Sequence, residues 1–215
     1  MIASLSVKAT PTLPSPRLLV APDMASGATR YYIGSLGKRP DEKDVKGVTI
    51  KNCTLKGTTN GARIKTYAAS LPLQASGIVY EDIIMDHVKN PVIIDQHYNS
   101  KTMSEDGKAS GVQISDVQFR DFTGTIVPPV VVNLDCNEAA PCQDIVLAEI
   151  VLTAVSEKPP LSSTCNNVKP TFSGNVTLGQ SSCRRITHRL PFLNQVSSMT
   201  KFLYSIIPIA PTLTD

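Results

Sequence analysis

The middle of the chain repeats one pattern of short apolar strands about every thirty residues. In each copy, apolar residues occupy the second, fourth and ninth positions, and a polar residue stands at the sixth. The copies are GVTIKNCTL at 47–55, GIVYEDIIM at 77–85, GVQISDVQF at 111–119 and DIVLAEIVL at 144–152, with polar residues Asn52, Asp82, Asp116 and Glu149. A period in this range is typical of stacked units that bury apolar faces against their neighbours.

A second strand follows in the first three copies. Residues 62–66 follow Val48 at the same interval at which residues 92–96 follow Ile78. The third, Val130-Val-Val-Asn-Leu134, comes four residues late. We expect Ile64, Ile94 and Val132 to occupy equivalent inward positions.

These features predict an all-β chain whose repeats form one coil each of a parallel β-helix. The strands are rich in β-branched residues and bounded by Gly, Asn, Asp and Pro. No helical periodicity is present, and neither leucine ladders nor helices support a leucine-rich or ankyrin repeat. An antiparallel sandwich is the alternative.

The alternation places Arg63 and Lys65 together on the outer face, with Cα atoms about 6.5–7 Å apart. One coil along, Asp95 lies under Lys65, and Asn133 follows. A carboxylated sugar would pair with the fork of Arg63 and the point charge of Lys65. The alternative is two ordinary solvated cations, with Lys65 paired to Asp95.

The five cysteines predict two disulfides and no metal site. Cys136 pairs with Cys142 and Cys165 with Cys183, which leaves Cys53 as a buried thiol. The sequence contains no C-x-x-C pair, so a zinc site is not expected. Asn52, Asp82 and Asp116 are interpreted as turn residues rather than metal ligands.

The histidines His87, His97 and His188 are interpreted as scattered surface residues. Asn175 is a better glycosylation candidate than Asn52.

The bulk composition and the two ends exclude several classes of partner. A net charge of +3 is too small for a dedicated nucleic-acid binder. Residues 1–32 lack a signal-peptide core and resemble a transit peptide only faintly. The stretch FLYSIIPIAPTL is too short, and too broken by proline, to span a bilayer.

The residues then suggest a family. IGSLGKRPDEKDVKGVTIKNCTLKGTTNGARIKTY at 33–67 and VYEDIIMDHVKNPVIIDQHY at 79–98 resemble the plant polygalacturonases of glycoside hydrolase family 28. Cys136-x5-Cys142 and Cys165-Asn-Asn-Val-Lys-Pro-Thr are similar to its C-terminal coils. The resemblance implies a right-handed β-helix that hydrolyses α-1,4-galacturonan in pectin with inversion, outside the cell and without a cofactor. It assigns substrate contacts to Arg63, Lys65 and, less specifically, Tyr98.

The departures from the family pattern concern the catalytic groups. The family's Asn-Thr-Asp and Asp-Asp motifs do not occur, and Thr29 stands where Gly-His-Gly places its histidine. We therefore expect no catalytic residue in this chain and interpret it as a truncated member. It is predicted to be a polygalacturonase-family protein that is inactive alone. The alternatives are a non-catalytic galacturonan-binding module and an inert fragment. Pectate lyases share the β-helix, but their calcium-binding acids are not recognisable.

The resemblance also divides the chain. Residues 1–32 do not match the family, residues 33–183 form the β-helix coils, and residues 184–215 form an irregular tail. A β-helix cut between coils exposes an edge near Val48–Leu55, which residues 1–32 are too poor in apolar pattern to cover. The chain is accordingly expected to be a monomer or aggregation-prone.

Overall fold

The computed structural model describes residues 32–68, 70–98 and 110–183 in full, and the backbone alone of three short strands before them. It divides the chain into two compact units, residues 1–185 and 186–215, and the second lies outside the described residues. The described part contains no helix long and apolar enough to cross a bilayer.

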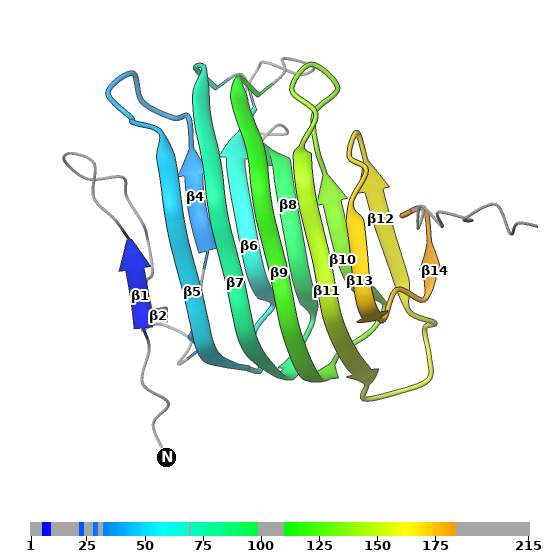
Figure 1. The fold of residues 1–215 in the computed structure, drawn as a ribbon. Coiled ribbons are helices and arrows are strands. Elements are labelled where there is room, and N and C mark those ends of the chain that lie inside the picture. The colour runs from blue at the N-terminus through cyan, green and yellow to red at the C-terminus, as the bar shows by residue number, and fades with distance from the viewer. Residues whose placement is uncertain are drawn as a thin grey trace, which may run out of the picture. The chain divides into compact units, whose positions relative to one another are not determined.

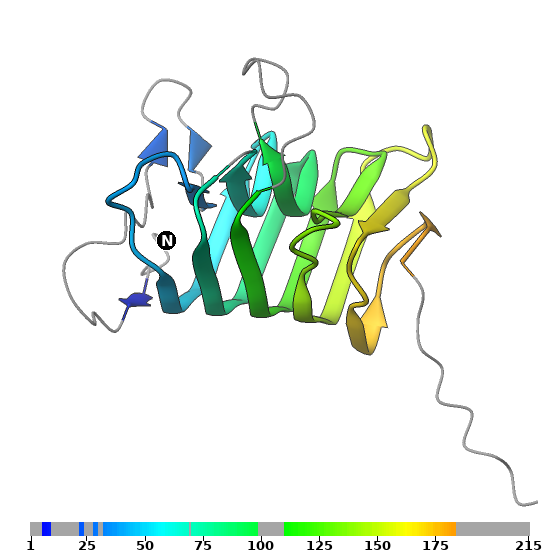
Figure 2. The ribbon, with the colours of Figure 1, turned by 90° about the horizontal axis from the view of Figure 1, so that it is seen from above.

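Two six-stranded sheets, parallel except for one edge strand, contain most of the described strands of the first unit, and they face each other across the core (Figures 1 and 2). Each coil contributes one strand to each sheet, so the predicted parallel β-helix is confirmed and the antiparallel sandwich is wrong. The front sheet contains β1 (Ser6–Ala9), β5 (Val45–Lys56), β7 (Leu73–Val88), β9 (Val112–Ile126), β11 (Gln143–Ala154) and β13 (Thr171–Val176). The rear sheet contains β4 (Tyr32–Leu36), β6 (Asn60–Tyr67), β8 (Asn90–Tyr98), β10 (Val130–Asp135), β12 (Ser162–Asn166) and β14 (Gln180–Ser181). A separate antiparallel pair joins β2 (Pro22–Asp23) to β3 (Ala28–Thr29).

The core lies between the sheets and consists of like residues stacked on successive coils. One column of the front sheet is Val48, Ile78, Val117 and Ile145, and the next is Ile50, Tyr80, Phe119 and Leu147. The rear sheet supplies Ile64, Ile94 and Leu134, all fully buried. Each such side chain contributes about 1.5–3 kcal/mol by leaving water, and each does so only because its neighbours are in register.

A left-handed residue in each long front strand explains the second, fourth and ninth apolar positions of the repeat. Asn52, Asp82, Asp121 and Glu149 all have positive φ and stand in one column. At this residue the alternation reverses phase, so in β5 the buried positions are Val48 and Ile50 before it and Cys53 and Leu55 after it. Asn and Asp tolerate this conformation better than most residues, which accounts for the polar sixth position.

The third copy of the repeat is shifted by five residues from the predicted alignment. Ile78 pairs with Val117 and Tyr80 with Phe119, so the equivalent segment is 116–124 rather than 111–119. Asp116 accordingly joins a second left-handed column with Gly47, Gly77 and Asp144. The sequence is ambiguous here because Val112-x-Ile114-x-Asp116 and Val117-x-Phe119-x-Asp121 carry the same pattern five residues apart.

The rear sheet needs a related correction at β10. Val132 pairs with Val92, and Leu134 takes the place next to Ile94 that was predicted for Val132. In the outward column, Asp135 and not Asn133 follows Asp95. With the corrected third copy, Val132 follows Val117 at nearly the interval found in the two earlier coils. The apparent delay of the third copy therefore came from the misplaced repeat.

The first front-sheet edge is partly covered, contrary to expectation. β1 pairs antiparallel with β5, from Ser6 opposite Lys51 to Ala9 opposite Val48. Backbone hydrogen bonding does not require an apolar pattern, so the composition of residues 1–32 did not reveal this pairing. The covered stretch is short and leaves the rest of β5 without a described partner strand on that side.

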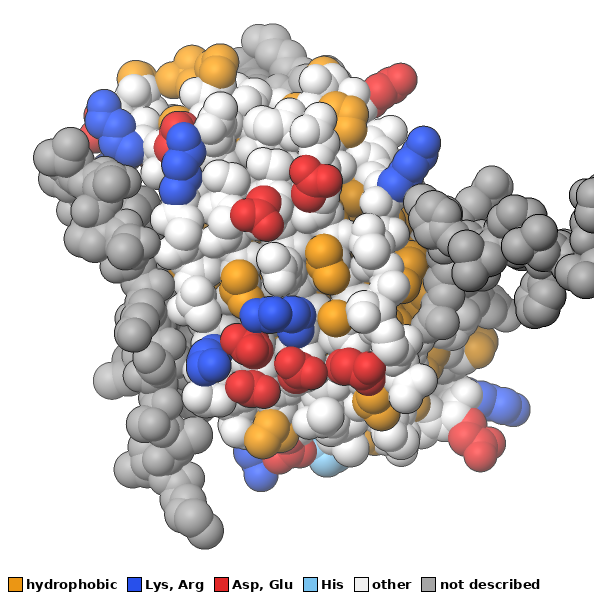
Figure 3. Space-filling view, in the orientation of Figure 1, with side chains coloured by type: hydrophobic (Ala, Val, Ile, Leu, Met, Phe, Trp, Pro, Cys, Tyr) orange, Lys and Arg blue, Asp and Glu red, His pale blue; other side chains and the backbone are white. Residues whose placement is uncertain are grey.

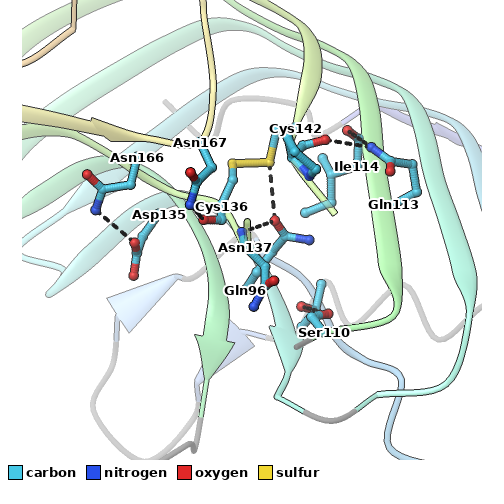
Figure 4. The surroundings of a disulfide bond; sticks show 12 residues. Gln96, Ser110, Gln113, Ile114, Asp135, Cys136, Asn137, Cys142, Asn166 and Asn167 are labelled. Atoms are coloured by element: carbon cyan, nitrogen blue, oxygen red, sulfur yellow. Dashed lines mark hydrogen bonds between the residues drawn. A yellow bond between two sulfur atoms is a disulfide. The ribbon is translucent and has the colours of Figure 1, made fainter. Parts of the chain in front are cut away.

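Both predicted cysteine pairs are joined in the structure, and Cys53 is a buried free thiol. Figure 4 shows the Cys136–Cys142 bridge beside the fully buried Gln96. The amide of Gln96 donates to the carbonyl of Val112 and accepts from the backbone N–H of Asn137. The disulfide loop is thus tied to the coil before it by a satisfied buried amide.

The left-handed column gives a test of the corrected register. Replacing Asp121 by Val puts a β-branched side chain at φ 57° and should lower the free energy of unfolding by about 1–2 kcal/mol. Thr123→Val, at an exposed position further along the same strand, should be neutral or slightly stabilising. Urea unfolding of both variants measures the difference, and equal stabilities would contradict the register.

Candidate functional site

The outer face of the rear sheet carries the two cations singled out by the sequence. In β6, Ala62, Ile64 and Thr66 are buried, while Arg63 and Lys65 alternate with them on the opposite side. Both cations are partly buried. Arg63 and Lys65 project from strand β6, whose backbone is hydrogen-bonded to β4 on one side and to β8 on the other. The fold therefore sets the positions of both side chains.

Arg63, not Lys65, makes the ion pair with Asp95. Arg63 Nη2 lies 2.6 Å from Asp95 Oδ2, and the two side chains are 18% and 22% exposed. The other oxygen, Oδ1, accepts the backbone N–H of His97 at 3.1 Å. The predicted alternative paired Lys65 with Asp95, which is its direct neighbour in register. The longer fork of Arg63 reaches the carboxylate diagonally across the strands.

Aromatic rings surround both cations. Lys65 Nζ lies 4.3 Å from the ring centroid of Tyr98 and 4.5 Å from that of Tyr32. The guanidinium of Arg63 also lies over Tyr98, at 5.4 Å. These distances are within the range of cation–π attraction. The predicted contact residue Tyr98 therefore stands beside both cations, and the structure brings all three predicted residues together.

The arrangement continues to a third cation. Tyr67 packs edge-on against Tyr98 with ring centroids 5.4 Å apart, and Lys38 Nζ lies 5.6 Å from the Tyr67 ring. We refer to these six residues as the basic–aromatic cluster: Tyr32, Lys38, Arg63, Lys65, Tyr67 and Tyr98. It extends over β4, β6 and β8 and the loop that follows β4.

The core supports this cluster from beneath. Tyr80 is fully buried, stacks on Phe119 at 5.3 Å and donates its hydroxyl to the carbonyl of Arg63 at 3.0 Å. Burial raises the pKa of Tyr80 well above its ordinary value, so the phenol remains a neutral donor. Arg63 Nε is buried without a partner among the described residues, which leaves one donor of the guanidinium unsatisfied.

The face becomes acidic toward the later coils. Asp135 follows Asp95 in register and contacts His97 Nδ1 at 3.1 Å and Asn166 Nδ2 at 3.0 Å. Asn137 approaches the other ring nitrogen of His97. The cations of the cluster thus lie on β6 and on the loop after β4, whereas Asp95 and Asp135 lie on β8 and β10.

The remaining predicted positions do not converge on a site. Asp82 and Asp116 lie on the outside of the front sheet, where Figure 3 shows acidic side chains gathered in bands with a few cations between them. Among the described residues no group of three or more His, Cys, Asp or Glu could hold a metal ion. His87 is exposed beside Asp86, and His188 lies outside the described residues.

The glycosylation candidate Asn175 is exposed, but it belongs to strand β13 rather than to a loop. Its backbone N–H donates to Glu149 at 3.2 Å. Asn52 is exposed as well, because the left-handed bend turns it out of the alternation. The two asparagines are thus similar in accessibility, which strand alternation alone did not predict.

Sequence reasoning missed half of the basic–aromatic cluster. Tyr67 follows Lys65 by two positions, so the same alternation that placed Arg63 and Lys65 outward also indicates this ring. Tyr32 pairs with Arg63 in register. Lys38 lies on a loop, where no periodicity applies, and only the three-dimensional structure brings it to the cluster.

The described residues thus form a parallel β-helix that carries partly buried cations among aromatic rings on one outer face. The model of the Glycosyl hydrolases family 28 matches residues 31–182. The chain belongs to this family.

Curated relatives are plant enzymes of the same family. The chain is 44% identical over 144 residues to an exopolygalacturonase of Arabidopsis thaliana, covering 67% of the chain and 32% of that protein. It is 41% identical over 142 residues to an exopolygalacturonase of Platanus acerifolia, covering 66% of the chain and 38% of that protein. A polygalacturonase of Nicotiana tabacum is 41% identical over 142 residues, with 66% and 36% covered. The chain therefore spans about a third of the length of these relatives.

The half-buried pair of Arg63 and Asp95 should contribute to stability. Asp95→Asn weakens the charged hydrogen bond to Arg63 and the acceptor for His97, and we expect a loss of about 1–3 kcal/mol. Asp41→Asn, at an exposed carboxylate paired with Arg39, should leave stability unchanged. Chemical denaturation compares the two, and equal effects would mean that the pair is no stronger than a surface contact.

Tyr80 should make stability depend on alkaline pH. Its pKa is raised in the folded chain, while the unfolded side chain ionises near its ordinary value of 10.0. The contribution of the Tyr80 phenol to the free energy of unfolding is therefore complete below that pH, and it is lost as the pH rises from there toward the pKa of the folded chain. Tyr80→Phe should cost about 1 kcal/mol at neutral pH, because the Arg63 carbonyl loses its donor. It should also flatten the alkaline decline in melting temperature, and an unchanged decline would contradict this.

Proposed function

We propose that this chain binds unesterified galacturonan on the outer face of the rear sheet, over β6 and β8, and does not hydrolyse it. The observation that carries the proposal is that Arg63 and Lys65 both lie over the ring of Tyr98, at 5.4 Å and 4.3 Å from its centroid. The names of the relatives, polygalacturonase and exopolygalacturonase, support the choice of polymer.

The chemistry of the cluster fits a uronate. A guanidinium has five N–H donors, and the ion pair with Asp95 is made through Nη2. The ammonium of Lys65 supplies a second positive charge, so a carboxylate placed between the two cations meets both. The rings of Tyr98 and Tyr32 offer flat apolar surface to the C–H face of a pyranose.

The carboxylates on this face are poorly suited to hydrolysis. Inversion requires one carboxyl group that gives a proton and a second that activates water, about 6.5–9.5 Å apart. Both oxygens of Asp95 are occupied, by Arg63 and by the N–H of His97, and Asp135 is engaged with His97 and Asn166. These contacts take up the oxygens that would have to meet a glycosidic oxygen or an attacking water within hydrogen-bond reach. The sequence also has no Asn-Thr-Asp or Asp-Asp motif.

The plant cell wall is the compartment that this function implies. Two disulfides suit an oxidising environment outside the cell. Galacturonan of the wall would be the partner. The other candidate function is that of a hydrolase whose acids lie on further coils, since the relatives are about three times as long as the matched segment.

Binding and hydrolysis are tested together with purified chain and polygalacturonic acid. Arg63→Ala and Lys65→Ala should each weaken retention on the polymer about tenfold, because each removes a charge-assisted contact. Lys56→Ala, which removes an exposed cation from the front sheet, is the matched control and should bind normally. No reducing sugar should be released by the unsubstituted chain or by any of the three variants.

Two results would contradict the proposal. Equal losses for Lys56→Ala and Lys65→Ala, with similar retention on unrelated polyanions, would indicate plain electrostatic attraction. Release of reducing sugar that Arg63→Ala abolishes would show that another carboxyl group acts as the acid.

A further inference from the structure

We propose that Lys38 and Tyr67 form a second uronate position next to Arg63, Lys65 and Tyr98. The chain would then recognise a run of at least two consecutive unesterified galacturonates rather than a single one. This inference rests on the proposed function and extends it to the length and esterification of the ligand.

The loop that carries Lys38 is held in place. The carboxylate of Glu42 accepts three successive backbone N–H groups, from Gly37 at 2.6 Å, Lys38 at 3.2 Å and Arg39 at 3.1 Å. Gly37 has φ 83° and packs so closely on Ser70 that a Cβ would overlap its side chain. The backbone at Lys38 is therefore held in place before and after this residue. This reduces the conformational entropy that the loop loses when Lys38 binds a ligand.

The two uronate positions are joined by aromatic surface. Tyr67 lies between Lys38 on one side and Tyr98 on the other, and Tyr98 in turn contacts Lys65. Tyr67 and Tyr98 are also paired in register on neighbouring strands. The rings thus form a continuous path from the ammonium of Lys38 to that of Lys65.

This arrangement selects by charge and by length. A single galacturonate has one carboxylate and cannot neutralise both cationic centres, whereas consecutive galacturonates present one carboxylate each. Methyl esterification removes the charge and with it the charge-assisted hydrogen bond. Binding should therefore strengthen from galacturonate to trigalacturonate by more than the extra ring contacts alone, and fall when the trimer is esterified.

The test uses the full chain and three ligands: galacturonate, trigalacturonate and fully methyl-esterified trigalacturonate. Titration calorimetry or ligand-observed NMR gives each affinity for the unsubstituted chain, Lys38→Met and Lys56→Met. Lys38→Met keeps the length of the side chain and should weaken trigalacturonate about tenfold, with galacturonate and the esterified trimer changed less than about twofold. Lys56→Met lowers the net charge equally and should leave all three affinities unchanged.

A positioning role for Glu42 follows from the same geometry. Glu42→Gln keeps the size of the side chain but weakens its hold on the three N–H groups, and it should reduce the preference for trigalacturonate over galacturonate. A purely structural role would lower the melting temperature without moving this ratio.

The outcomes separate the two proposals. If the unsubstituted chain binds none of the ligands, the proposed function is wrong and this inference falls with it. If it binds galacturonate and trigalacturonate, and Lys38→Met behaves like Lys56→Met toward the trimer, the proposed function stands and the second uronate position is overturned.

Discussion

Backbone hydrogen bonding between successive coils, in parallel and in register, is the constraint on which this structure depends. Strands of neighbouring coils lie about 4.8 Å apart, so each residue is stacked on its counterpart in the next coil. A slip of one residue would exchange the buried and outward faces along a whole strand. The columns Val48–Ile78–Val117–Ile145 and Ile64–Ile94–Leu134 show that one register satisfies both sheets. The left-handed residues reverse the alternation at the same level in every coil and so preserve that register around the bend.

The candidate site is a direct consequence of this stacking. Register places Arg63 beside Tyr32 on one coil, and it places Tyr67 beside Tyr98 on the other. The core contributes Tyr80, whose hydroxyl meets the carbonyl of Arg63 from inside the solenoid. In the outward column of Lys65, the next two coils carry Asp95 and Asp135, so the charge of this column changes sign at β8. The cations and the rings of the cluster therefore lie together on β4, β6, β8 and the loop after β4, which is the combination that the proposed binding of an acidic sugar polymer uses.

The fold class and the core of the site could be predicted from the sequence because both depend on simple periods. Alternation alone put Arg63 and Lys65 outward and Ile64 inward, and the constant interval between paired strands aligned the first two coils correctly. The prediction failed at the third coil, where Val112–Asp116 and Val117–Asp121 offer the same pattern, and the structure pairs the second of these segments with Ile78 and Tyr80. It paired Asp95 with Lys65, because sequence spacing identifies the direct neighbour but not the reach of an arginine across strands. Lys38 was beyond prediction, since its position depends on Glu42 closing a loop.

The most direct test asks whether an oligogalacturonide lies across β6 and β8 on the outer face of the rear sheet. The isotope-labelled chain is titrated with trigalacturonate, and its backbone amide chemical shifts are followed by NMR. We predict that the largest shifts fall on residues 63–67, on Tyr98 and on the loop at Lys38, while the front-sheet strands β5, β7 and β9 stay unchanged. Shifts concentrated on the front sheet, or a saturable change that leaves Arg63, Lys65 and Tyr98 unaffected, would contradict binding at this face.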